Sequence, residues 1–154
     1  MKTYSPKAKD FHPEWYLIDA TDQPLGRLAT QVAQLLRGKQ RPLFVPHMSA
    51  GDHVVIVNAN KISLTGRKME NKKYFRHSGH PGGLREVPAS VMLQRRPRFV
   101  VEHAVKGMLP HNTLGRAMLK RLRVYDGPTH PHQGQLKARN DEGQLKATTE
   151  ETTS

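Results

Sequence analysis

The chain has no cysteine, few aromatic residues and no long apolar run. Without thiols it can form neither disulfides nor thiolate metal sites, which fits a reducing compartment. No apolar stretch approaches the roughly 20 residues that span a bilayer, so we expect no membrane partner. The first ten residues also lack an apolar run, so we expect no signal peptide. Together these absences predict a soluble intracellular protein.

Acidic residues are scarce in the middle of the chain. Between Lys61 and Tyr125 there are fifteen Lys and Arg but only three acidic residues, Glu70, Glu86 and Glu102. The rest of the chain holds ten of each sign, so the whole formal net charge of +12 lies in this basic segment. Clustered positive charge of this kind creates a positive electrostatic field, and its most common binding partner is the phosphate backbone of a nucleic acid. The alternative is a solvated face kept for solubility, although such surfaces usually mix both signs.

Two short apolar runs predict buried strands, at residues 15–18 and 53–57. The second run is apolar almost throughout, which is typical of a parallel sheet covered on both faces. The chain has 154 residues, enough for one domain with a core. A helical pattern separates the two runs, and this order predicts a right-handed crossover in an α/β domain.

The helical pattern between these runs has clear ends. Pro24 suits the first turn, Thr21 or Asp22 is available as a cap, and Gly38 suits the stop. Apolar residues recur at three- and four-residue spacing, namely Leu25, Leu28, Ala29, Val32, Leu35 and Leu36. This spacing predicts an amphipathic helix with one buried face.

Within the basic segment, the sequence predicts short elements joined by loops. We expect a strand at residues 74–77, a loop at 78–83, and short helices opened by Pro88 and Pro97. A third helix is expected to start near Asn112 or Thr113 and to turn three residues inward, Leu114, Met118 and Leu122. Residues 1–136 are therefore expected to form a single α/β domain. Residues 137–154 are polar and charged and predict a flexible C-terminal tail.

Motifs for catalysis are missing. The pair Gly38-Lys39 has neither the upstream glycine nor the following hydroxyl of a phosphate-binding loop. The three acidic residues of the basic segment are each sixteen positions apart, so no local carboxylate pair is present. We expect Asp19, Asp22 and Asp52 to be cap and turn residues. The sequence therefore predicts a protein that is not an enzyme and needs no cofactor.

Nine histidines raise the question of a metal site. His77 and His80 lie three apart, and His130 and His132 lie two apart, but prolines place both pairs in irregular loops. No thiolate supports either pair. We expect no metal, and interpret histidines in a basic loop as donors to phosphate or as rings that stack on bases.

Nucleic acid accounts for more of these residues. In the predicted third helix, Arg116, Lys120 and Arg123 share one face by spacing. Arg121 falls near the edge of the apolar stripe, where we expect its stem to pack and its head to reach outward. The alternative is a solvated basic face. The glycine loop at 78–83 would allow close backbone approach, with aromatic rings nearby to stack on unpaired bases, but it also fits a simple surface turn. The candidate RNA-binding residues are Lys61, Arg67, Lys68, Lys72, Lys73, Arg76, His77, His80, Arg85, Lys106, Arg116, Lys120, Arg121 and Arg123.

The order of motifs resembles a known family. The most specific stretch is Glu102-His103-Ala104-Val105-Lys106-Gly107-Met108-Leu109-Pro110. Further matching segments follow in order and together span about nine-tenths of the chain, from residue 1 to residue 133. They are residues 1–4, 15–20, 25–30, 36–39, 51–55, 58–59, 64–66, 78–84, 114–116, 119–122, 125–128 and 130–133. In these segments the chain resembles the bacterial form of the large-subunit ribosomal protein thirteen family.

This resemblance implies a three-layer α/β/α fold around a small parallel sheet, with basic loops and helical extensions. It also implies a cytoplasmic protein on the large ribosomal subunit that binds its ribosomal RNA, supports early assembly and contacts neighbouring ribosomal proteins. We expect no homo-oligomer. The competing interpretations are a free-standing regulator that binds messenger RNA and, less favoured, an enzyme at the carboxyl edge of the sheet.

Overall fold

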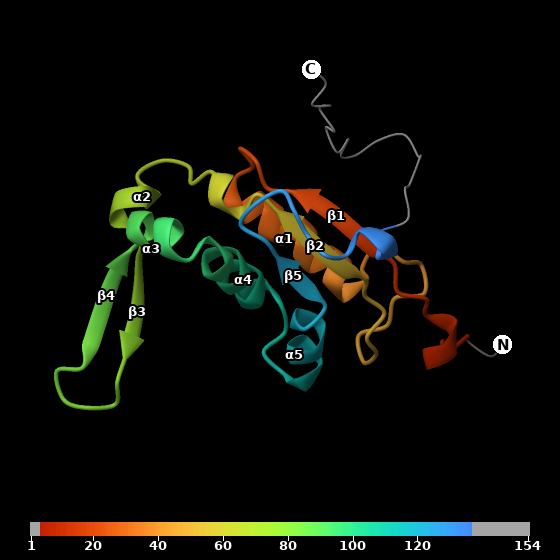
Figure 1. Ribbon diagram of the computed structural model, residues 1–154. Coiled ribbons are helices and arrows are strands. Elements are labelled where there is room, and N and C mark those ends of the chain that lie inside the picture. Colours follow the sequence, from red (N-terminus) through yellow and green to blue (C-terminus); the bar gives the residue numbers. More distant parts are fainter. Residues whose placement is uncertain (1–3, 137–154) are drawn as a thin grey trace, which may run out of the picture.

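The computed structural model describes residues 4–136 and centres on a parallel sheet of three strands (Figure 1). The strands are β1 (Trp15–Asp19), β2 (His53–Val57) and β5 (Leu122–Val124), with β2 in the middle. Leu17 lies opposite Val55, and Val54 lies opposite Leu122. The two strands predicted at residues 15–18 and 53–57 are confirmed, and so is the α/β class.

Helix α1 (Leu25–Arg37) joins β1 to β2 and buries the predicted apolar face. Pro24 takes the cap position without a side-chain hydrogen bond, so the expectation that Thr21 or Asp22 caps this helix is wrong. The Thr21 hydroxyl instead donates to the Asp19 carboxylate at 2.7 Å. Gly38 ends the helix with a φ of 78°, a left-handed conformation that glycine adopts without a steric penalty.

The end of α1 packs backbone to backbone against the approach to β2. A Cβ atom on Gly38 would lie 2.5 Å from the Ala50 carbonyl oxygen, and one on Gly51 would lie 1.7 Å from the Leu36 carbonyl oxygen. Neither distance is possible for a real side chain, so both positions require glycine. The chain therefore turns from helix into strand within a very small space.

Helices cover one face of the sheet. They are α1, α4 (Pro97–Met108) and α5 (Thr113–Leu119), and α4 begins at Pro97 as predicted. Side chains from both layers form one buried cluster, which includes Ile18, Leu28, Val32, Val54, Ile56, Val100, Val105, Met118, Leu122 and Val124. This apolar burial stabilises the domain.

The other face of the sheet is covered by the segment that follows β5. Trp15 stacks on His53 with ring centroids 4.4 Å apart, and the His132 ring lies 5.2 Å from Trp15. The Tyr125 hydroxyl hydrogen-bonds to His132 Nε2 at 2.9 Å. Burial, reinforced by the charges of Arg121 and Arg123, lowers the pKa of His53. This layer is an irregular segment ending in the short 3₁₀ helix η3 (Gln133–Gln135) rather than a long helix.

A second, two-stranded sheet forms an arm that stands away from the domain (Figure 1). Strands β3 (Lys73–His77) and β4 (Leu84–Pro88) pair as an antiparallel hairpin. Two short helices, α2 (Lys68–Asn71) and α3 (Ala89–Arg95), lie at its base. We use "the arm" for residues 68–95. The predicted strand, glycine loop and helix after Pro88 are confirmed, whereas β4 and α2 were not predicted.

The predicted third helix is shorter than its sequence pattern indicated. Asn112 caps α5 by accepting a hydrogen bond from the Gly115 amide at 2.8 Å, but the helix ends at Leu119. The expectation that Leu122 lies on this helix is wrong, because Leu122 begins β5. The open edge of β2 offers backbone partners there: the Val54 amide donates to the Arg121 carbonyl at 3.1 Å. Tertiary pairing therefore overrides the helical spacing.

Asp52 lies immediately before β2 and is fully buried. It accepts hydrogen bonds from the Glu14 amide at 2.9 Å and from Gln40 Nε2 at 2.6 Å, and it forms an ion pair with Arg41. We expected Asp52 to be a cap or turn residue; it is instead the acceptor that joins three segments of the chain. Two further 3₁₀ helices complete the described structure, η1 (Ala8–Asp10) and η2 (Ala59–Lys61).

Candidate nucleic-acid interface

Thirteen of the fourteen candidate RNA-binding side chains are exposed, and Arg121 is the exception. The Arg121 guanidinium is half-buried and donates a hydrogen bond to the Gly51 carbonyl. It therefore supports the backbone contact between α1 and β2. The expectation that its head reaches outward is wrong, because the tight turn at Gly51 leaves a carbonyl that needs a donor.

The hairpin places two arginines face to face. Arg76 of β3 and Arg85 of β4 are directly opposite partners in the strand register. Like charges directly opposite each other in a sheet are destabilising. Neither has a carboxylate partner among the described residues, since Glu86 pairs with Lys73 at 2.7 Å on the other face. This pair therefore forms a strong local positive field that an external anion would neutralise.

The other face of the hairpin is partly apolar. The Phe75 side chain is 63% exposed and Leu84 is 54% exposed, so neither contributes to the core. His77 lies opposite Leu84 and accepts a hydrogen bond through Nδ1 from the Gly79 amide at 2.9 Å. His80 lies exposed in the connecting turn. The structure thus brings the predicted loop residues to the far end of the arm.

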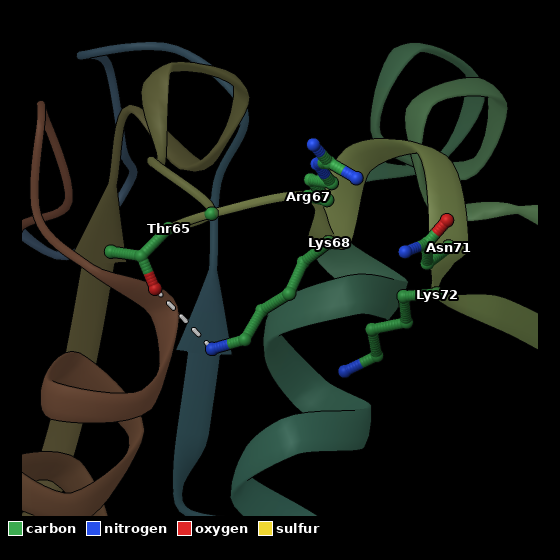
Figure 2. Close-up of a pocket in the computed structure, with 6 residues that line it drawn as sticks. Thr65, Arg67, Lys68, Asn71 and Lys72 are labelled. Atoms are coloured by element: carbon green, nitrogen blue, oxygen red, sulfur yellow. Dashed lines mark hydrogen bonds between the residues drawn. The ribbon is translucent and has the colours of Figure 1, made fainter.

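An open hollow lies at the base of the arm. It is lined by Thr65, Gly66, Arg67, Lys68, Asn71 and Lys72 (Figure 2). Lys68 Nζ donates to Thr65 Oγ1 at 3.3 Å, and the Lys72 ammonium lies 5.4 Å from the centre of the Tyr74 ring. Figure 2 shows the Lys68 and Lys72 side chains extending to the same side, with Arg67 pointing away from them. Two ammonium groups on the same side of one concave surface suit a phosphate group.

The predicted helix face does not exist as a single stripe. Arg116 lies on α5 and Lys120 directly follows it, but Arg123 lies on β5 and donates to the Lys120 carbonyl at 2.8 Å. The expectation of one helical face is wrong because the helix stops at Leu119. All three side chains remain exposed, as do Lys61 on η2 and Lys106 on α4.

The arginines around the junction of α3 and α4, namely Arg95, Arg96 and Arg98, were not predicted to bind RNA. Arg98 forms an ion pair with Asp126 at 3.1 Å and lies 5.7 Å from the Tyr125 ring, so it ties α4 to the end of β5. Arg95 and Arg96 are exposed, and no ion pair in residues 4–136 involves them. The run of three arginines within four positions was the signal that could have identified this second cationic site.

The described part of the chain has neither a membrane-spanning helix nor a metal-binding cluster. None of its helices is long and apolar enough to cross a membrane. Its histidine, aspartate and glutamate side chains form no cluster of three that could hold a metal ion. The distinctive surface within residues 4–136 is the set of cations on the arm and around α4.

Unpaired cations on a projecting hairpin, beside a small α/β domain, define a nucleic-acid-binding protein. Comparison with known proteins makes this class specific. The family described as "Ribosomal protein L13" matches residues 13–131, and the chain belongs to it. The resemblance in the sequence motifs is thereby confirmed, and the protein belongs to a structural family rather than a family of enzymes.

Individual relatives agree closely over most of the chain. The "Large ribosomal subunit protein uL13" of Thermobifida fusca is 56% identical over 135 residues, which cover 88% of this chain and 91% of the relative. The protein of the same name from Parafrankia sp. is 58% identical, with 88% and 92% covered. That of Syntrophomonas wolfei is 54% identical, with 88% and 94% covered.

Proposed function

We propose that the protein is a structural constituent of the large ribosomal subunit that binds its ribosomal RNA and supports early subunit assembly. Membership of the ribosomal protein L13 family supports this function. It also supports a cytoplasmic location on the ribosome and contacts with neighbouring ribosomal proteins. We expect the protein to bind as a single copy, with residues 1–136 as the RNA-binding domain.

The observation that carries this proposal is the opposed pair Arg76 and Arg85 on the arm. An isolated two-stranded hairpin is only marginally stable in water, and two opposed positive charges weaken it further. Phosphate groups of RNA would bring anions between and around the guanidinium groups, and arginine holds phosphate through paired hydrogen bonds. Binding would therefore stabilise the arm and the complex together.

The salt dependence of binding tests the RNA contact. If roughly six to ten of the cations reach phosphates, the affinity for large-subunit ribosomal RNA should fall by about 10³ to 10⁵ between about 50 and 200 mM salt, on the calibration for duplex DNA. Filter binding at several salt concentrations would measure this slope. An affinity that hardly changes with salt would contradict binding through the phosphate backbone.

A free-standing regulator of messenger RNA would use the same basic surface. Sedimentation separates the two functions. A structural constituent stays with large subunits at a constant ratio after a high-salt wash, because many contacts hold it in place. A regulator is removed by the same wash. Family membership favours the first outcome.

A further inference from the structure

Helix α4 presents a stacked pair of rings at the surface. Phe99 and His103 lie one helical turn apart, with ring centroids 5.4 Å apart and planes inclined by only 19°. Both residues are exposed, and Phe99 retains 39% of its accessible surface. This exposure leaves aromatic surface that the domain itself does not cover.

The arm holds this ring pair in place from one side. Tyr74 of β3 is buried and meets both rings edge-on, at 6.0 Å from Phe99 and 5.8 Å from His103. Edge-to-face contacts of this kind are favourable and restrict the orientation of the rings. Figure 1 shows α4 between the arm and the sheet, so the ring pair sits where the arm joins the domain.

Cations flank the ring pair along the chain. Phe99, His103 and Lys106 lie on one stripe of α4 by their spacing, and Arg96 is the cap residue directly before the first turn of this helix. Arg96 and Lys106 are exposed and take no part in the ion pairs found in residues 4–136. Glu102 lies on the adjacent stripe and pairs with neither of them. Aromatic surface between two free cations matches the alternation of base and phosphate along a nucleic-acid strand.

We propose that Phe99 and His103 form a stacking platform for an unpaired base of the ribosomal RNA, with Arg96 and Lys106 binding the phosphates on either side. The proposal rests on the proposed function and adds base stacking to its phosphate contacts. A neighbouring protein would cover the rings but would leave two cations without anions unless it supplied carboxylates at both ends. A single strand of RNA supplies both kinds of contact at once.

Stacking and charge contacts respond differently to salt, and this difference gives the test. The double variant Phe99→Leu with His103→Leu keeps an apolar helix surface but removes both rings. Its affinity for purified large-subunit ribosomal RNA should fall about 5- to 150-fold at every salt concentration, with an unchanged salt slope. The variant Arg96→Gln with Lys106→Gln should instead make the slope shallower. His103→Tyr should retain most of the binding.

Met108→Ala is the matched control, because Met108 is 45% exposed at the end of the same helix but lies off the stripe. It should bind like the parent. Normal binding by the leucine variant would overturn the platform, and weakened binding by Arg76→Gln with Arg85→Gln in the same assay would show that the proposed function still holds. Failure of both variants to weaken binding would overturn both proposals. A leucine variant that binds the RNA normally but enters large subunits poorly would show that the rings face a protein instead.

Ultraviolet cross-linking of the unaltered protein to ribosomal RNA gives a second test that does not depend on a variant folding. Trypsin cuts after Arg98 and Lys106, so residues 99–106 are released as one peptide that contains both rings. We expect this peptide to carry a nucleotide at Phe99 or His103. Cross-links confined to peptides of the arm would overturn the stacking platform and leave the phosphate contacts intact.

Discussion

The guanidinium of Arg41 bridges the fully buried carboxylate of Asp52 and the carbonyl of His12, which it reaches at 2.7 Å. One arginine after α1 thus joins the chain before β1 to the chain before β2. Asp52 also accepts hydrogen bonds from the Glu14 amide and from Gln40 Nε2. Its negative charge is therefore fully compensated inside the protein. Buried charges persist when they are paired and hydrogen-bonded in this way.

Replacing Arg41 by Met should destabilise the fold strongly. The variant leaves the buried Asp52 carboxylate without its counter-charge, and breaking such a pair typically costs about 3–5 kcal/mol. Urea unfolding followed by circular dichroism would measure the loss. Arg98→Met is the matched control, because its ion pair with Asp126 is about half-exposed and such pairs contribute about 0–1 kcal/mol. Equal losses in the two variants would contradict the role of the buried pair.

Replacing Arg76 and Arg85 together by Gln should weaken RNA binding and leave folding intact. Removing the opposed charges relieves repulsion within the hairpin, so the melting temperature should stay level or rise slightly. Each lost phosphate contact should reduce the salt slope by about one. Arg27→Gln with Lys39→Gln removes the same charge from exposed positions outside the arm. If this control loses as much affinity as the arm variant, overall charge rather than the arm controls binding.

Arg121 should affect stability, whereas its exposed neighbours should affect RNA binding. Arg121→Met leaves the Gly51 carbonyl without its donor, a loss of about 1–3 kcal/mol, with little change in the salt slope. Arg116→Gln with Lys120→Gln should show the reverse pattern, because exposed substitutions usually change stability by less than about 0.5 kcal/mol. Unfolding and RNA binding should be measured on both variants. If Arg121→Met weakened RNA binding without loss of stability, Arg121 would belong to the RNA-binding surface after all.

The Asp19 carboxyl should make stability depend on pH. Burial acts to raise its pKa, but hydrogen bonds from Asn58 and Thr21 outweigh burial, so the pKa is lowered in the folded protein. The carboxylate form therefore stabilises the fold. This contribution to the free energy of unfolding is fully present above the pKa of Asp19 in the unfolded chain, about 4. It is lost as the pH falls through the lower pKa of the folded protein. Unfolding free energies measured across this range should fall more steeply for the parent than for Asp19→Asn, and identical profiles would contradict this assignment.

The tail predicted at residues 137–154 lies outside the described residues, and its dispensability remains a prediction from composition. Those positions hold three basic and four acidic residues and a single large apolar one, Leu145. A slightly acidic segment gains little by lying along RNA. A chain ending at Leu136 should therefore fold and enter large subunits in competition with the full-length protein. A clear deficit in this competition would show that the tail contacts a neighbour.

The sequence predicted best the elements whose signals are local. The run at residues 53–57 and the helix ended by Gly38 carry their own apolar pattern and stop residue. Strand β5 has only three residues, and its position depends on the free edge of β2, which no local pattern reveals. The prediction that Arg123 shares a helical face with Arg116 and Lys120 was wrong for the same reason, since Arg123 lies on β5.

For the candidate site, too, the sequence revealed what is local and missed what depends on tertiary contacts. The charge of the basic segment was visible in the sequence, and most of its candidate residues are exposed. The opposed position of Arg76 and Arg85 depends on hairpin register, and the internal role of Arg121 depends on a backbone contact with Gly51. The ring pair of Phe99 and His103 depends on how Tyr74 of the arm packs against α4, which no local pattern reveals.

The arm interrupts the chain between two strands that pair with each other, β2 and β5. The last strand of the sheet is therefore synthesised only after the whole arm and α4. During translation the arm leaves the ribosome while the domain that supports it is still incomplete. A nascent chain in this state lacks β5, so the edge of β2 that β5 occupies in the folded domain is still unpaired.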